Sequence, residues 1–236
     1  MENWRGKGRA PPSPTNTMNK HNEARLAILI SGRGSNMHSI IDACNSNFLR
    51  AKVCLVISNN SDSKGLISAR EVGLPTKCID HRLYESRESF DRALLTALKE
   101  VKPDFILLAG FMRILTPLMI DPFLGRLINI HPSLLPKYPG LNTHQRAIDA
   151  GDKEAGATVH FVTSALDEGP IIIQAKVPIL STDTVDTLAS KILEKEHQIY
   201  PLGIQMLIER RVALENNETI MNGSALPAKA ISRAQT

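Results

Sequence analysis

From Leu26 onward, short apolar runs alternate with longer segments in which apolar residues recur at helical spacing. The runs "LAILI", "KVCLVI" and "FILLAG" are apolar at most positions, as expected of strands that are buried on both faces. Between the last two of them, Phe90 to Val101 carries one apolar stripe and predicts the clearest helix of the chain. This alternation predicts an α/β fold, in which a doubly wound, mostly parallel sheet carries helices on both faces.

The pattern changes after "LINIH", residues 127–131. The runs "ATVHFV" and "PIIIQAKVPI" have the composition of strands, and the segment "TSALDEG" between them is too short for a helical crossover. We therefore expect an antiparallel C-terminal strand pair. A last helix is predicted from Thr184 to about Arg210, followed by a loose tail over residues 213–236.

A chain of 236 residues with 42% hydrophobic content is long enough to bury a substantial core. We expect one catalytic domain over residues 25–212, with a phosphate-binding, Rossmann-like half at 25–125 and a second half at 126–212. Residues 1–24 are rich in proline and polar side chains and lack periodicity. They are expected to be a disordered extension or an expression remnant, with an organellar transit peptide as the alternative.

The formal net charge is +4, and much of the excess lies in the amino-terminal tail. It is therefore weak support for a nucleic-acid partner, and none is expected. The three cysteines form no CxxC pair, which indicates a reduced, cytoplasmic protein. No apolar run is long enough to span a bilayer, and no membrane association is expected.

The stretch "ILISGRGSN", residues 28–36, reads as a strand, a glycine-rich turn and the start of a helix. Glycines let backbone amides approach a ligand, and Ser35 or Asn36 can cap a helix whose positive end attracts an anion. Met37 replaces the third glycine of the dinucleotide fingerprint, and no Walker A lysine follows. A phosphate monoester therefore fits better than a dinucleotide, with an ordinary tight turn as the alternative.

Two polar residues, Asn129 and His131, interrupt the apolar run "LINIH". Strand side chains alternate, so both point to one face, and Pro132 ends the strand just after them. Ligands of open α/β folds collect at this carboxyl edge. There an amide can donate to a developing oxyanion and an imidazole can exchange a proton. The alternative is a satisfied polar pair at a strand end.

Such a histidine needs a partner, and the best candidate is Asp167 in "LDEGP", where Gly169 and Pro170 force a turn. A carboxylate within reach would favour the charged imidazole, whereas the alternative is a solvated turn residue. The other histidines show no metal-ligand spacing, so no metal is expected. His160 is interpreted as an ordinary hydrogen-bonded strand residue, and His144 as the start of a short helix.

Four motifs together resemble the phosphoribosylglycinamide formyltransferase family: "LISGRGSN", "LAGFMRIL", "NIHPSLLPKYPG" and "VHFVTSALDEGPIIIQAKVP". The match runs from about Leu26 to Leu207. The resemblance implies transfer of a formyl group from the cosubstrate N10-formyltetrahydrofolate to the primary amine of glycinamide ribonucleotide in purine biosynthesis. It implies no metal and makes residues 126–212 the catalytic and folate half.

The resemblance also assigns roles. It makes Asn129, His131 and Asp167 the catalytic set. It places the substrate phosphate on Gly34, Ser35 and Asn36, the ribose on Glu196, and the walls of the amine site at Ile130 and Pro132. It implies that folate lies against Asn129, Arg87, Met112, Arg113, Ile114 and Leu115.

Three rival functions share some of these features. A formyltetrahydrofolate deformylase would use the same asparagine, histidine and aspartate with water as the acceptor, but it usually has an additional amino-terminal regulatory domain. Methionyl-tRNA formyltransferase adds a carboxyl-terminal domain. A phosphate-ligand binding protein would not need a titrating group beside the ligand. We expect only small-molecule partners, glycinamide ribonucleotide and folate, and a monomer or homodimer.

Overall fold

The computed structural model describes residues 23–225, and its main element is one seven-stranded sheet in the order β3-β2-β1-β4-β5-β6-β7. These strands are β1 (Ala24–Ile30), β2 (Ala51–Ser58), β3 (Thr76–Cys78), β4 (Phe105–Leu108), β5 (Leu127–His131), β6 (Glu154–Phe161) and β7 (Ile171–Pro178). Strands β1 to β5 pair in parallel, whereas β6 pairs antiparallel with both β5 and β7. The predicted sheet and its antiparallel C-terminal strand pair are confirmed.

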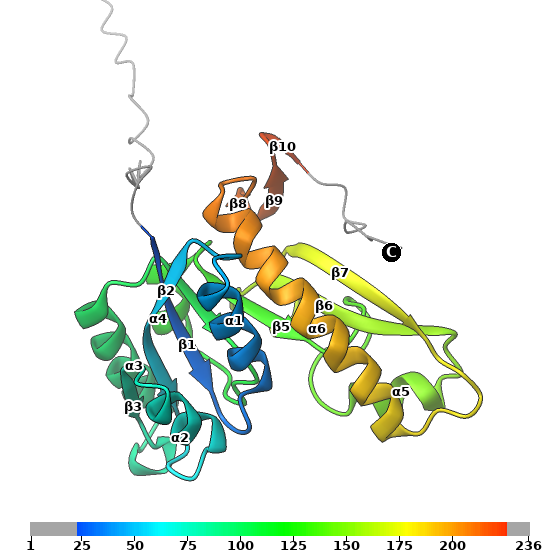
Figure 1. Cartoon of the computed structure of the whole chain (residues 1–236), viewed down its shortest axis with the longest axis horizontal. Helices are drawn as coiled ribbons and strands as arrows, with labels where there is room; N and C mark the ends of the chain where they lie inside the picture. Colours follow the sequence, from blue (N-terminus) through cyan, green and yellow to red (C-terminus); the bar gives the residue numbers. More distant parts are fainter. Residues whose placement is uncertain (1–22, 226–236) are drawn as a thin grey trace, which may run out of the picture.

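Helices cover both faces of this sheet, with α1 and α6 on one face and α3 and α4 on the other (Figure 1). The helices are α1 (Ser35–Asn45), α2 (Lys64–Glu71), α3 (Arg87–Val101), α4 (Pro117–Ile120), α5 (Thr143–Asp149) and α6 (Val185–Ile208), with 3-10 turns η1 (His81–Leu83) and η2 (Asp121–Phe123). Helix α3 buries its apolar stripe as predicted. Ser86 starts that helix with a capping box, and Lys102, in a left-handed conformation, ends it.

The core has two layers, one on each side of the sheet, because strand side chains alternate between faces. In β1, Ile28 and Ile30 pack in the layer with α1 and α6, whereas Ala27 and Leu29 pack in the layer with α3. All four side chains are completely buried. The apolar run of β1 is therefore the expected signature of a strand covered on both faces.

The strand order changes direction at β1. The chain first builds β2 and β3 on one side of β1, and β4 then returns to its other side. The strands β1 and β4 are neighbours in the sheet. The segment after β1 and the segment after β4 therefore diverge from one another at the carboxyl edge of the sheet. This topological switch point is where open α/β sheets form a ligand crevice.

The expectation of a loose tail after residue 212 is wrong for residues 213–225. They form an antiparallel three-stranded sheet of β8 (Val212–Glu215), β9 (Glu218–Met221) and β10 (Ser224–Ala225) beside the end of α6 (Figure 1). Asn216 and Asn217 join β8 to β9 and both have positive φ, at 50° and 61°. Two left-handed asparagines are typical of a tight hairpin, so this Asn-Asn pair was the overlooked sequence signal.

The predicted extension at residues 1–24 lies almost entirely outside the described residues, although Ala24 already begins β1. The remaining tail after residue 225 also lies outside them. Within residues 23–225, no helix combines the length and apolarity that crossing a membrane requires.

Tyr200 joins the long helix α6 to the sheet. Its side chain is completely buried, and its hydroxyl lies 3.1 Å from the carbonyl oxygens of both Leu108 in β4 and Ile128 in β5. One phenolic hydrogen thus serves two buried acceptors, one at the carboxyl end of β4 and one next to Asn129 in β5. The contact anchors α6 to the part of the sheet that carries the site described below.

We predict that Tyr200→Phe lowers the free energy of unfolding by about 1–3 kcal/mol, because both carbonyl groups lose a buried donor while the ring packing remains. Thermal and urea unfolding would measure the loss. Tyr84→Phe is the matched control, since Tyr84 is half-buried and contributes its ring to an edge contact with Phe90. Equal stability of the two variants would contradict the prediction.

Candidate active site

The carboxyl end of β5 holds Asn129 and His131 on one face of the sheet, as the strand pattern predicted. The register of the antiparallel pair places His160 of β6 directly opposite Asn129, and Thr158 opposite His131. His131 is 5% exposed, whereas Asn129 is half-buried. The pairing of β5 with β6 thus adds a second imidazole to the site.

His131 has an acceptor at each ring nitrogen. Its Nε2 donates to the backbone carbonyl of Tyr138 at 2.9 Å, and its Nδ1 lies 3.4 Å from Oδ2 of Asp167. The side chains of His131 and Asp167 are 7% and 10% exposed. An imidazolium carries a hydrogen on both nitrogens and would match both acceptors. The structure therefore brings together the histidine and the carboxylate that were expected to pair.

Asp167 is held by its own loop and by the loop after β5. Its backbone is left-handed, with φ of 55°, and its Oδ2 accepts a hydrogen bond from the Gly140 amide at 2.8 Å. A Cβ at Gly169 would overlap the carbonyl oxygen of Phe161, so only glycine fits where this loop returns to β7. The carboxylate is thus positioned by backbone contacts.

His160 is the site residue that the sequence interpretation missed. Burial lowers its pKa well below the usual histidine range, although its hydrogen bond to the Phe161 carbonyl and the nearby Asp167 act in the opposite direction. The neutral ring donates from Nδ1 to that carbonyl at 2.8 Å, so its Nε2 is an acceptor. Asn129 Nδ2 lies 3.1 Å from this nitrogen and donates to it. The Asn129 amide is therefore fixed in orientation.

The glycine loop, residues 32–34 between β1 and α1, has the geometry of an anion site. Gly34 is the N-cap of α1, with φ of 77°, and no side chain caps the helix. The expected capping by Ser35 or Asn36 is therefore wrong, and the amides of the first turn have no side-chain acceptor. The carbonyl of Gly32 accepts from the Ser63 hydroxyl at 2.8 Å and from the Gly65 amide at 3.0 Å, which braces the loop against α2.

Asn36 faces Glu196 of helix α6. Its Nδ2 donates to Glu196 Oε2 at 2.6 Å, and both residues are buried, at 8% and 7% exposure. Burial raises the pKa of Glu196, and the hydrogen bond from Asn36 acts in the opposite direction. Asn36 Oδ1 is buried without a partner in the structure. The Glu196 carboxyl group and the unpaired Asn36 Oδ1 are thus available to a ligand beside the glycine loop.

An open pocket lies next to Asn129, His160 and Asp167. Its other walls come from the segment after β4 and from residues 162–166. Of the residues expected to contact folate, Arg113, Ile114 and Leu115 line this pocket together with Asn129. Met112 and Arg87 are exposed and are not among its lining residues.

The two residues predicted as walls of the amine site, Ile130 and Pro132, do not line the open pocket. Ile130 is 6% exposed and packs in the core layer with α1 and α6, on the face opposite Asn129. Its side chain therefore does not reach the pocket. Pro132 borders a separate small cavity with Tyr138 and Thr143.

Among residues 23–225, histidine, cysteine, aspartate and glutamate side chains form no group of three or more that could hold a metal ion.

The model of one protein family, described as formyl transferase, matches residues 24–204. The phosphoribosylglycinamide formyltransferase of Escherichia coli is 46% identical over 202 residues, which cover 86% of this chain and 95% of that protein. The human trifunctional purine biosynthetic protein adenosine-3 is 42% identical over 84% of this chain, which corresponds to 20% of the human protein. The solved phosphoribosylglycinamide formyltransferase of Coxiella burnetii superimposes with a TM-score of 0.86 at 40% identity, covering 89% of this chain and 99% of the other.

We predict that Asn36→Leu destabilises the protein in a pH-dependent manner. Without the amide, the already raised pKa of Glu196 rises further, so keeping this carboxylate ionised in the fold becomes more costly. Stability should be close to that of the parent below the ordinary pKa of a carboxyl. It should be lost as the pH rises through the raised pKa, with a deficit of about 1–3 kcal/mol at neutral pH.

Urea unfolding at about pH 5 and about pH 8 would measure this difference. Adding Glu196→Gln to Asn36→Leu removes the titrating group and should remove most of the extra pH dependence. A deficit of the same size at both pH values in the single variant would show that the two side chains are not coupled.

Proposed function

The chain belongs to the formyl transferase family, and from this premise we propose that it transfers the formyl group of N10-formyltetrahydrofolate to the primary amine of glycinamide ribonucleotide. The products are the N-formyl ribonucleotide and tetrahydrofolate, in de novo purine biosynthesis. The observation that carries the proposal is the convergence of Asn129, His131 and Asp167 beside an open pocket, within a fold that has a free helix N-terminus at its switch point.

The reaction needs a group that stabilises negative charge on oxygen. The neutral amine attacks the formyl carbon, a carbon–nitrogen bond forms, and the carbonyl electron pair moves onto oxygen. Asn129 donates an amide hydrogen to this oxyanion. His131, whose two ring nitrogens already face acceptors, stabilises the oxyanion through the positive charge of its imidazolium form. When the oxyanion collapses, the bond between the formyl carbon and the folate nitrogen breaks.

Protons must also move, because the attacking nitrogen loses one and the departing folate nitrogen gains one. Asp167 faces His131 at 3.4 Å and keeps an acceptor beside the imidazolium throughout this exchange. His160 has a different part. As a neutral acceptor for one Asn129 hydrogen, it leaves the second amide hydrogen free to point toward the substrate.

The substrates occupy opposite sides of this constellation in the proposal. The ribonucleotide phosphate binds the amides of Gly34, Ser35 and Asn36, where the helix dipole favours an anion. Buried Glu196 accepts hydrogen bonds from the ribose hydroxyls. The folate lies in the pocket lined by Arg113, Ile114, Leu115 and Asn129, with Met112 and Arg87 contacting its more exposed part.

Amine-site walls at Ile130 and Pro132 have weaker support. The Ile130 side chain faces the core, so it would contribute its backbone alone, and Pro132 would set the course of the following loop. We further propose a cytoplasmic enzyme that acts on small molecules as a monomer or homodimer. All three cysteines are free, which suits a reducing compartment.

The function is tested by following N10-formyltetrahydrofolate turnover with and without glycinamide ribonucleotide. We expect turnover only when the ribonucleotide is present, with one formylated product for each tetrahydrofolate released. Release of formate in its absence would instead identify a formyltetrahydrofolate deformylase, in which water takes the place of the amine.

We predict that Asn129→Ala and His131→Ala each lower kcat by at least about a hundredfold, because each removes one group that stabilises the oxyanion. Both variants should remain folded by circular dichroism, since they truncate side chains at the strand end. Turnover would be measured on the same preparations. Near-parent turnover in either variant would refute its catalytic role.

A further inference from the structure

The wall of the open pocket that follows β4 is held only in part by burial of its own side chains, since Phe111 and Leu115 are 9% and 6% exposed. Met112 and Ile114 are 65% and 50% exposed, so they gain little from packing. The backbone here has also left the sheet, since the last strand residue is Leu108. Between the buried residues Phe111 and Leu115, the backbone of residues 112–114 therefore depends on polar contacts from other parts of the chain.

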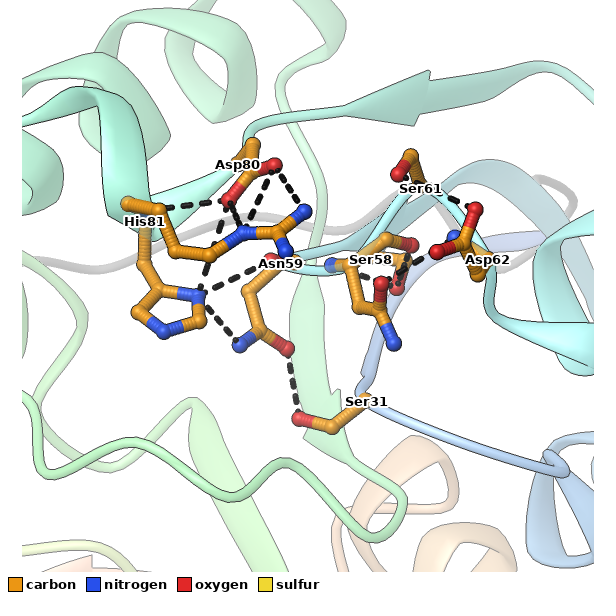
Figure 2. A network of polar contacts seen from close by, with 9 residues as sticks. Ser31, Ser58, Asn59, Ser61, Asp62, Asp80 and His81 are labelled. Carbon is orange, nitrogen blue, oxygen red and sulfur yellow. Dashed lines mark hydrogen bonds and ion pairs between the residues drawn. The ribbon is translucent and has the colours of Figure 1, made fainter.

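One such contact reaches Met112 from the neighbouring strand. The Met112 amide donates to the hydroxyl of Ser31 at 2.8 Å, and Ser31 is the first residue after β1. The same hydroxyl donates to Oδ1 of Asn59 at 2.6 Å, at the end of β2 (Figure 2). Because Asn59 is 4% exposed and holds the hydroxyl hydrogen, the lone pairs of Ser31 remain directed at Met112.

Asn59 is itself held from its other side. Its Nδ2 lies 3.1 Å from Nδ1 of His81, and that nitrogen is also 3.0 Å from the Asn59 carbonyl oxygen (Figure 2). The ring of His81 meets Phe90 edge to face, with centroids 6.4 Å apart. Phe90 stacks on Phe111 at 6.5 Å, and Phe111 lines the pocket. The polar contacts end at Met112 and the aromatic contacts end at Phe111. These two residues are adjacent in the segment after β4, and Phe111 lines the pocket.

The far end of the segment has a second anchor. Thr116 donates to Oδ2 of Asp91 through its amide at 2.6 Å and through its hydroxyl at 2.7 Å. Asp91 is completely buried in α3. The wall is therefore fixed at Met112 by β1 and at Thr116 by α3, and the lining residues Arg113, Ile114 and Leu115 lie between these two points.

We propose that Ser31 and Asn59 are positioning residues for the folate cosubstrate, which set the pocket wall without touching the ligand. The proposal rests on the proposed function, because it takes this pocket as the folate site. Ser31 also directly precedes the glycine loop, so its hydroxyl ties together the two segments that diverge at the switch point between β1 and β4. Hydrogen bonds to preorganised pocket walls contribute to affinity by reducing the cost of ordering the site.

Ser31→Ala should raise the KM for N10-formyltetrahydrofolate about fivefold to tenfold, the effect of one lost hydrogen bond. The KM for the ribonucleotide and kcat should change less than about twofold, since the proposed catalytic groups lie on β5 and the Asp167 loop. Ser31→Thr retains the hydroxyl and should restore most of the folate affinity. Ser61→Ala is the matched control, because exposed Ser61 lies in the same polar cluster but donates only to Asp62 (Figure 2).

Amide hydrogen exchange supplies a readout that is independent of turnover. In Ser31→Ala the Met112 amide should lose protection, while the Thr116 amide, still bound to Asp91, should keep it. Thr116→Val removes one hydroxyl donor at the other anchor, and an approximately threefold rise in folate KM is expected there. This second variant also tests the wall if Ser31→Ala does not fold.

The proposed function and the positioning role of Ser31 would be refuted by different results. A parent chain without ribonucleotide-dependent turnover would refute the proposed function, whatever the variants do. With an active parent, an unchanged folate KM in Ser31→Ala would overturn the positioning role. Equal increases in both KM values would also overturn it, because the change would then act through the glycine loop.

Discussion

The parallel pairing of β1 with β4 is the constraint on which the site depends. Because the chain reverses its direction of sheet building at this pair, the segments after the two strands separate and leave a crevice at the sheet edge. The glycine loop and the start of α1 form one side of this crevice. Residues 109–116 form the other, and the hydrogen bond from Met112 to Ser31 joins the two sides at their base.

The antiparallel pairing of β5 with β6 adds the chemistry to this frame. A parallel neighbour would have placed a strand carboxyl end beside β5, whereas the antiparallel β6 runs the other way and sets His160 directly against Asn129. Two imidazoles on this face then differ in environment. Burial lowers the pKa of His160 and so favours its neutral form, whereas His131 has an acceptor at both nitrogens. The His160 ring can thus orient the Asn129 amide, while a charged His131 ring can stabilise negative charge beside it.

Buried polar groups carry a free-energy cost unless they are paired, and this protein places several of them around the crevice. Glu196 is paired with Asn36, and Asp91 receives two hydrogen bonds from Thr116. In both pairs one oxygen remains without a partner within the described part of the chain, Oδ1 of Asn36 and Oδ1 of Asp91. The first belongs to a residue that would bind the ribonucleotide in the proposed function. The second belongs to the carboxylate that anchors the segment after β4 through Thr116.

The local sequence pattern alone was sufficient for the main elements. The period of a strand places Asn129 and His131 on one face, and a connection too short for a helix requires the two strands around Asp167 to be antiparallel. Both predictions depend only on residues near one another in the chain. The loose tail was a wrong prediction even at this local level, because the left-handed turn at Asn216 and Asn217 was overlooked.

Only the tertiary structure decided which distant residues meet. Asn36 and Glu196 are 160 positions apart, and Glu196 had no sequence signal besides the family resemblance. The approach of Asp167 to His131, the pairing of His160 with Asn129 and the contact of Ser31 with Met112 likewise depend on strand order and register. Periodicity specifies the face on which a side chain lies, but the partner across that face is set by how the elements pack. For this reason the sequence by itself determined the fold class and two of the catalytic candidates, whereas the packed sheet determined the geometry that lets them act together.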